Sequence, residues 1–157
     1  MQKVAIFADV QNIYYTCRQR HQKHFNYSRF WELSTENRQV IAAFAYAIDR
    51  GDSKQCGFQK ILNDIGFIVK LKPYIQRSDG SAKGDWDVGI TLDVVEWAEQ
   101  VDVIILLSGD GDFQLLLDKV RQRNGVKCEV YGVKALTAPA LIHAADCFKS
   151  IEGDLLL

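Results

Sequence analysis

Short apolar runs alternate along the chain with stretches that have the hydrophobic spacing of amphipathic helices. Five of these runs predict buried β-strands, and they span residues 4–8, 67–71, 103–107, 128–132 and 148–151. Gly66 and Gly125 stand just before two of the runs. A glycine at that place is typical of a helix C-terminus, so we expect a helix to lead into each of those two strands.

The hydrophobic spacing of the intervening stretches predicts helices at residues 59–63, 87–100 and 113–123. The apolar run at 40–48 fits a buried strand or a buried helix equally well by pattern. We favour a strand, because the polar residues 49–52 then form its exit loop. The alternation of strands and helices predicts an α/β domain whose parallel sheet is covered on both faces.

The bulk composition adds few constraints. A chain of 157 residues with 48% hydrophobic and 25% charged residues fits one domain, residues 1–157. No apolar run approaches the roughly 18 residues of a membrane span, and the start shows no signal peptide, so we expect a cytoplasmic protein. The four cysteines show no CxxC pairing, which argues against a zinc site or a disulfide framework. A net charge of −1 means that any binding of a polyanion depends on local basic patches.

Aspartates stand where ligands usually bind in a parallel sheet, at the carboxyl ends of strands and the starts of helices. Asp9 and Asp110 each follow an apolar run, and Asp112 comes two residues later at the expected start of a helix. Asp85 and Asp87 are at the start of another expected helix. Each acid near a helix start also has an ordinary reading as a cap, so only the whole set points to a site.

Carboxylates that converge repel one another unless protons or cations neutralise them. Mg²⁺ and Mn²⁺ prefer oxygen ligands and commonly act on phosphates, which suits a set of acids without histidines. Other classes fit less well, since GxGxxG and the P-loop are absent. Position 11 is Gln11, where phosphatases with an aspartyl nucleophile have a second acid.

The order of these motifs resembles the NYN domain family, a branch of the PIN-like nucleases, and within it the bacterial LabA-like proteins. The resemblance covers nearly the whole chain. It rests on FADVQN at 7–12, KGDWDV at 83–88 with Asp93 beyond it, SGDGDF at 108–113, and residues 140–146.

The resemblance implies a Rossmannoid, PIN-like three-layer α/β/α sandwich with a mainly parallel sheet. It also implies Mg²⁺- or Mn²⁺-dependent hydrolysis of single-stranded RNA. The implied metal-binding and catalytic residues are Asp9, Asp87, Asp110 and Asp112. The implied accompanying residues are Asn12, Lys83 and Ser108 for the substrate, with Asp85 and Asp93 as secondary positions. The family's lysine-glycine-apolar-aspartate spacing has one extra residue here, so Asp85 is an alternative to Asp87; we favour Asp87 because Val88 and Asp93 then fit the family pattern.

Basic and aromatic side chains near the acids are candidates for contacts with RNA. One group follows Asp9, another lies in the loop before Asp87, and a third lies farther along the chain: Tyr14, Tyr15, Arg18, Arg20, His21, Lys23 and His24; Arg77 and Lys83; Arg121, Arg123 and Lys127. Lys83 is the strongest of them, because it precedes Asp87 by four residues. The run from Arg18 to His24 also reads as an ordinary solvated helix end.

Two further classes of function remain open. The first is a non-catalytic regulatory domain that binds nucleic acid or a nucleotide and keeps the acidic metal pocket, and an exposed apolar surface near Leu155–Leu157 would favour it. The same tail is a candidate for self-association into a homo-oligomer. The second is a metal-dependent phosphatase of small phosphate esters.

Overall fold

The computed structural model describes residues 1–73, 75–76, 82–83 and 85–157, with the backbone alone at 73, 75–76 and 82–83. The strands of the central sheet are β1 (Gln2–Asp9), β2 (Arg38–Asp49), β3 (Ile68–Pro73), β6 (Val103–Leu107), β7 (Lys127–Gly132) and β8 (Cys147–Ser150). The helices are α1 (Val10–His21), α2 (Tyr27–Thr35), α3 (Ser53–Ile65), α4 (Asp87–Trp97), α5 (Gln114–Asn124) and α6 (Pro139–Ala144). Short 3₁₀ turns span Gly111–Phe113, Lys134–Leu136 and Gly153–Leu155, and β4 (Ile75–Gln76) pairs with β5 (Ala82–Lys83).

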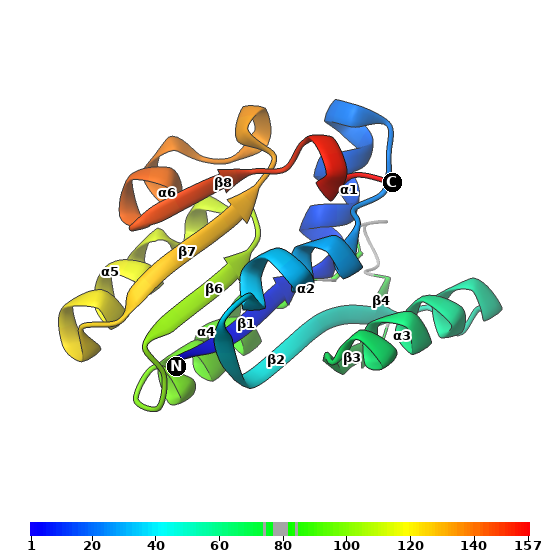
Figure 1. Cartoon of the computed structure of the whole chain (residues 1–157). Coiled ribbons are helices and arrows are strands. Elements are labelled where there is room, and N and C mark those ends of the chain that lie inside the picture. The colour runs from blue at the N-terminus through cyan, green and yellow to red at the C-terminus, as the bar shows by residue number, and fades with distance from the viewer. Residues whose placement is uncertain (74, 77–81, 84) are drawn as a thin grey trace.

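The six strands of the central sheet are all parallel and lie in the order β3-β2-β1-β6-β7-β8 (Figure 1). Side chains of β1 alternate between its two faces, with Val4 and Ile6 on one and Ala5 and Phe7 on the other. The first face packs against α1, α2 and α3, and the second against α4, α5 and α6. The expected three-layer α/β/α sandwich with a parallel sheet is therefore confirmed.

The direction in which strands are added to the sheet reverses next to β1. The chain first adds β2 and β3 on one side of β1, and after α4 it adds β6, β7 and β8 on the other. β1 and β6 pair in parallel from Val4 opposite Val103 to Ala8 opposite Leu107, so their carboxyl ends lie together. In open α/β sheets this reversal of direction is the point where ligands bind.

The strand pattern was predicted well. Each of the five apolar runs forms a strand, and the ambiguous run at 40–48 is the middle of β2. Gly66 and Gly125 end α3 and α5 with positive φ angles of 138° and 69°, as the glycines before the strands indicated.

Some elements were not predicted from the sequence. α2 has buried side chains at Tyr27, Phe30 and Ser34, and Asn26 caps it by accepting a hydrogen bond from the Arg29 N–H. α3 begins at Ser53, six residues before the expected start at 59. The expected loop at 77–84 lies outside the described residues, apart from the backbone at 82–83.

The C-terminal tail packs within the same chain. The Asn26 N–H donates to the Leu155 carbonyl (2.8 Å), and the Leu157 N–H donates to the His24 carbonyl (2.9 Å). Of the three leucines in this expected apolar surface, Leu155 is buried, Leu156 is half-buried and Leu157 is exposed. In the described part of the chain, no helix has the length and apolar character needed to span a membrane.

Candidate metal centre

Asp9 occupies the junction between β1 and α1. Its carboxylate caps the helix by accepting from the Asn12 N–H (3.5 Å), and it also accepts a hydrogen bond from the Ser108 hydroxyl (3.1 Å). The side chain is only 7% exposed. An apolar strand that runs directly into a helix therefore leaves a charged group at the buried end of the sheet.

The loop after β6 brings Asp110 to the same place. The Ser108 hydroxyl accepts from the Asp110 N–H (3.2 Å), and the Asn12 side-chain oxygen accepts from the Gly109 N–H (2.9 Å). Asp110 in turn caps the 3₁₀ turn by accepting from the Asp112 N–H (2.9 Å). Asn12 and Ser108 thus connect α1 and β1 to the loop that carries Asp110.

Asp87 enters from the opposite layer, at the first turn of α4. Trp86 holds this end of the helix, because its indole N–H donates to the Ala47 carbonyl on β2 (2.9 Å) and its ring lies 5.3 Å from that of Tyr46. The Asp85 side chain accepts from the Asp87 N–H (3.3 Å) and is exposed. Of the two alternatives left open by the spacing, Asp87 points to the other acids.

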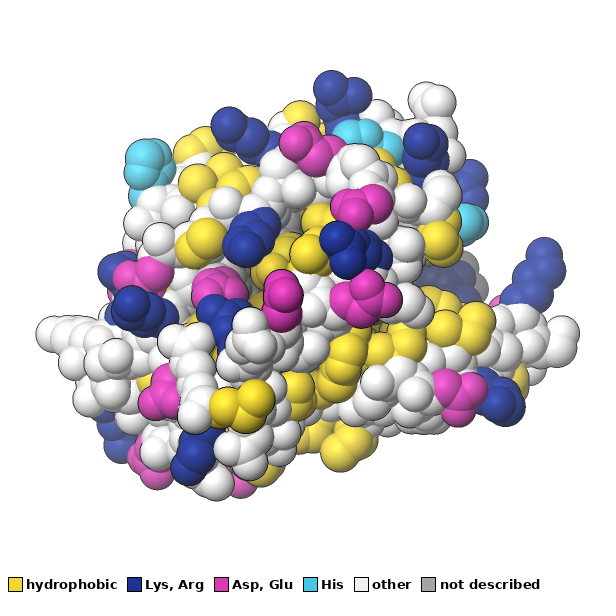
Figure 2. Space-filling view, in the orientation of Figure 1, with side chains coloured by type: hydrophobic (Ala, Val, Ile, Leu, Met, Phe, Trp, Pro, Cys, Tyr) yellow, Lys and Arg dark blue, Asp and Glu magenta, His cyan; other side chains and the backbone are white. Residues whose placement is uncertain are grey.

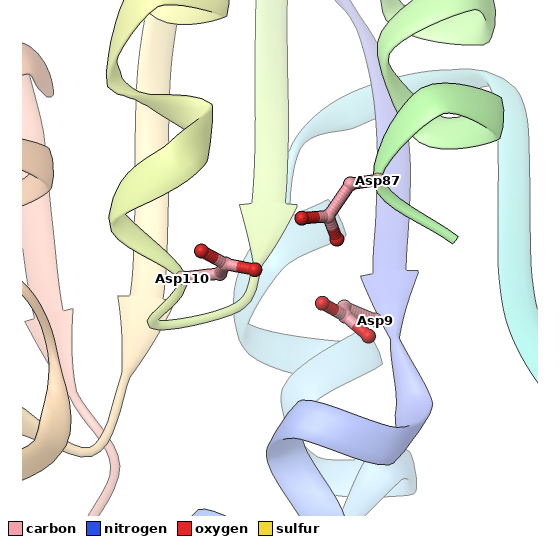
Figure 3. Close-up of side chains that lie close together, drawn as sticks. All are labelled: Asp9, Asp87 and Asp110. Carbon is pink, nitrogen blue, oxygen red and sulfur yellow. The ribbon is translucent and has the colours of Figure 1, made fainter. Parts of the chain in front are cut away.

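The three side chains of Asp9, Asp87 and Asp110 point toward one another (Figure 3). One carboxylate oxygen from each lies within 4.8 Å of the others. Burial raises the pKa of Asp9 to about 6, with further increases from Asp110 and Asp85, although hydrogen bonds from Ser108 and Asn12 oppose this effect. The pKa of Asp87 is raised to about 7, and burial is the largest cause. Its hydrogen bond with Asp110 and the charges of the nearby acids raise this pKa further. The cluster accumulates negative charge that lacks full compensation.

The donor set fits a hard divalent cation. Among the described residues, none of the ion pairs formed by Lys or Arg includes Asp9, Asp87 or Asp110. One carboxylate oxygen from each of these three acids lies within 4.8 Å of the others, so small side-chain rotations would allow all three to hold one ion. Oxygen ligands without nitrogen or sulfur favour Mg²⁺ or Mn²⁺ over zinc.

A pocket of about 360 Å³ opens over the acids. It is lined by Asp9, Gln11, Asn12, Tyr15, Thr16, Asp85, Asp87 and Asp110. Gln11 and Thr16 were not predicted as site residues. Their signal in the sequence is helical spacing, since Gln11 and Tyr15, like Asn12 and Thr16, are four residues apart and share one side of α1.

Three of the expected site residues lie apart from this cluster or outside the described side chains. Asp112 is exposed in the 3₁₀ turn and is neither in the three-aspartate cluster nor among the lining residues of the pocket. Asp93 accepts from the Tyr46 hydroxyl (2.7 Å) and the Lys70 ammonium (2.6 Å), which connects α4 to β2 and β3. Lys83 belongs to β5, but its side chain is outside the described part of the chain.

Comparison with known proteins agrees with this architecture. The family model of the NYN domain matches residues 3–152. The chain belongs to the NYN domain family. It is 27% identical over 152 residues to the low amplitude and bright protein LabA of Synechococcus elongatus. The aligned residues cover 92% of this chain and 81% of LabA. NYN membership, the likeness to LabA and the acidic triad together indicate a function related to nucleic acids.

A solved structure has the same fold. The crystal structure of a protein of unknown function from Vibrio parahaemolyticus is 55% identical and superposes with a TM-score of 0.95. The match covers 99% of this chain and 96% of that chain. This relative therefore shares the α/β/α sandwich over nearly all of both chains.

Proposed function

We propose that this NYN domain is a metal-dependent nuclease that hydrolyses phosphodiester bonds of single-stranded RNA. The observation that carries the proposal is the convergence of Asp9, Asp87 and Asp110 within 4.8 Å at the switch point of the sheet. A cluster of like charges destabilises the fold unless a bound cation or protons neutralise it, and such clusters are common at functional sites. The open pocket above it has room for a phosphodiester.

In this proposal the three aspartates hold Mg²⁺ or Mn²⁺, and Asn12 and Ser108 keep two of them in place. When bound, the cation supplies positive charge to the phosphate oxygens and activates water for hydrolysis. Because Asp9 and Asp87 have raised pKa values, protons compete with the cation for the same oxygens. The activity should therefore fall as the pH decreases below neutrality.

The test is cleavage of end-labelled single-stranded RNA in Mn²⁺, in Mg²⁺ and in EDTA, with wild type beside Asp110→Asn. The Asn side chain can still accept the hydrogen bond from the Asp112 N–H, so the turn should fold in the variant. Asp118→Asn is the matched control, because Asp118 lies on α5, outside the three-aspartate cluster, and its carboxylate accepts a hydrogen bond from Gln114. We expect metal-dependent cleavage that Asp110→Asn abolishes and Asp118→Asn retains.

Three kinds of result would contradict the proposal. Cleavage that persists in EDTA or in Asp110→Asn would indicate a different site or a contaminant. If no RNA is cut although calorimetry detects Mn²⁺ binding, the acidic pocket instead serves a regulatory domain that binds without catalysis. Turnover of nitrophenyl phosphate without RNA cleavage would identify a phosphatase of small esters.

A further inference from the structure

Two large aromatic side chains are exposed on α1 beside the acidic pocket. Tyr14 is 43% exposed and Tyr15 is 52% exposed, whereas the same helix buries Val10, Ile13 and Cys17. Neither tyrosine is needed to fill the core. Exposed aromatic rings next to a phosphate site are the groups that stack on unpaired bases.

The surrounding side chains hold Tyr14 in place. The His24 ring stacks on Tyr14 with the centroids 5.9 Å apart, and an Arg18 N–H donates to the Tyr14 hydroxyl (3.2 Å). The Tyr15 ring packs against Tyr14 in an edge arrangement, with the centroids 5.4 Å apart. Tyr15 itself lines the pocket that contains Asp9 and Asp110. The aromatic group therefore continues directly from the acids along α1.

Positive charge lies farther along the same direction. The last turn of α1 carries Arg18, Arg20 and His21, and Lys23 and His24 follow it. Figure 2 shows Lys, Arg and His side chains around the end of the molecule where Figure 1 places α1. The acidic pocket repels a polyanion. Basic side chains beyond the pocket would offset this repulsion by contacting the phosphates on either side of the bound phosphodiester.

We propose that the Tyr14–Tyr15–Arg18 surface of α1 binds the single-stranded RNA next to the phosphodiester at the acids. Tyr15 stacks on the neighbouring base, and Arg18 contacts a flanking phosphate while it supports Tyr14. Tyr15 follows Asp9 by six residues, or about 9 Å along the helix axis, which neighbouring nucleotides of one strand can span. The inference rests on the proposed function and adds a reason for selecting single strands, because the bases of a duplex are not available for stacking.

The experiment measures binding, so that it does not depend on cleavage. Fluorescence anisotropy measures the Kd of a labelled single-stranded RNA of mixed sequence, about 12 nucleotides long. The buffer contains EDTA, and each substitution is made in the Asp110→Asn protein so that the RNA is not cut. We expect Tyr15→Ala to weaken binding about tenfold, Tyr15→Leu to weaken it similarly, and Tyr15→Phe to retain it, because stacking requires the ring rather than the hydroxyl. A duplex of the same sequence should bind more weakly and respond little to Tyr15→Ala.

Arginine variants on the same helix supply the matched control for charge. Arg18→Ala and Arg20→Ala remove the same charge, but of these two arginines it is Arg18 that contacts Tyr14. We expect Arg18→Ala to weaken binding more and to reduce the slope of log Kd against log salt by about one. Circular dichroism melts should show that all variants fold.

The outcomes separate this inference from the nuclease proposal. Unchanged RNA affinity in Tyr15→Ala, or equal losses in Arg18→Ala and Arg20→Ala, would overturn the inference even if wild type cuts RNA. Absence of measurable RNA binding would overturn it as well. If RNA binding depends on Tyr15 but the wild type does not cut RNA, the result would support the proposed RNA-binding surface and contradict the nuclease proposal.

Discussion

Ser108 donates a hydrogen bond from its hydroxyl to the Asp9 carboxylate over 3.1 Å, although the two residues are 99 positions apart in the chain. The same hydroxyl accepts from the Asp110 N–H (3.2 Å), so one fully buried side chain contacts two of the three acid-bearing segments. It also lowers the pKa of Asp9 and opposes the effect of burial. Ser108 therefore favours the ionised form of the Asp9 carboxylate and holds its orientation.

Ser108→Ala should weaken Mn²⁺ binding by about tenfold to a hundredfold, because the loss of an outer hydrogen bond leaves a ligand less well oriented and more easily protonated. Calorimetric titration with Mn²⁺ measures this change. Ser34→Ala is the matched control, since Ser34 is equally buried but its hydroxyl has no hydrogen-bond partner in the described part of the chain. Equal Mn²⁺ affinity in Ser108→Ala and wild type would show that Asp9 does not need this contact.

The sequence indicated the acids at the ends of strands more readily than it indicated where they meet. Asp9 and Asp110 follow apolar strands, and this alone marks them as strand-end groups. Their convergence depends on β1 and β6 being neighbours, which results from long-range pairing that local patterns do not encode. Asp112 illustrates this limit. It is two positions from Asp110 in a tight 3₁₀ turn, yet Asp110 belongs to the cluster and Asp112 is exposed.

Gly89→Ala should disturb the metal centre through Trp86. A Cβ at position 89 would lie 2.5 Å from Trp86 Cε3, so the indole that holds the start of α4 must move, together with the Asp87 backbone. We expect a loss of Mn²⁺ affinity and a lower Tm. Gly57→Ala is the control, because position 57 of α3 has open space around it and alanine favours the helix by about 0.5–1 kcal/mol. Wild-type affinity in Gly89→Ala would mean that Asp87 does not depend on Trp86.

Asp93 should contribute to stability rather than to metal binding. Its carboxylate accepts from Tyr46 and Lys70 in a partly buried network, so Asp93→Ala leaves an ammonium without its partner. We expect unfolding in urea to show a loss of about 2 kcal/mol, with Mn²⁺ affinity little changed. Asp64→Ala, which breaks the exposed pair with Lys60, should have little effect on either quantity. Loss of Mn²⁺ affinity without a loss of stability in Asp93→Ala would assign Asp93 to the site.

The pattern of the chain predicted the sheet more completely than the helices around it. Continuous apolar strands are recognisable because both of their faces are buried, and β2 shows this over most of its length. α2 was missed, although Tyr27, Phe30 and Ser34 have helical spacing, because the segment is short and its serine at a buried position weakens the hydrophobic signal. Helix and strand boundaries near the acids depend on caps such as Asp110, whose role becomes visible only with the turn it closes.

The stability of the metal-free protein should fall as the pH rises toward neutrality. On folding, the pKa of Asp9 rises from 3.8 to about 6 and that of Asp87 rises from 3.8 to about 7. Between the lower, unfolded pKa and these higher, folded values, the folded state binds more protons than the unfolded state. Stability then decreases with increasing pH across this window. Thermal melts in EDTA from about pH 5 to about pH 8 measure the effect. With Mn²⁺ present, the increase in Tm over the EDTA sample should grow across the same window, because the ion binds the deprotonated acids.

Asp87→Asn is the control for this pH dependence. It removes the group with the larger shift, so the decrease in Tm near neutral pH should become smaller in EDTA, and the increase in Tm on adding Mn²⁺ should be lost. An unchanged pH profile in this variant would show that Asp87 does not titrate in the expected window.

Asp110→Asn and Asp112→Asn should behave differently although they lie two residues apart and change the charge equally. Asp110 belongs to the cluster, so its loss should reduce Mn²⁺ affinity by about a hundredfold or more, since affinity for hard cations depends on the number of charged ligands. The same substitution removes repulsion and should raise the Tm in EDTA near neutral pH. Asp112 is exposed and contributes its backbone N–H, which Asn retains, so Asp112→Asn should bind Mn²⁺ as wild type does. Calorimetry on both variants decides whether three or four aspartates would hold the metal. Equal losses of Mn²⁺ affinity would add Asp112 to the candidate ligands.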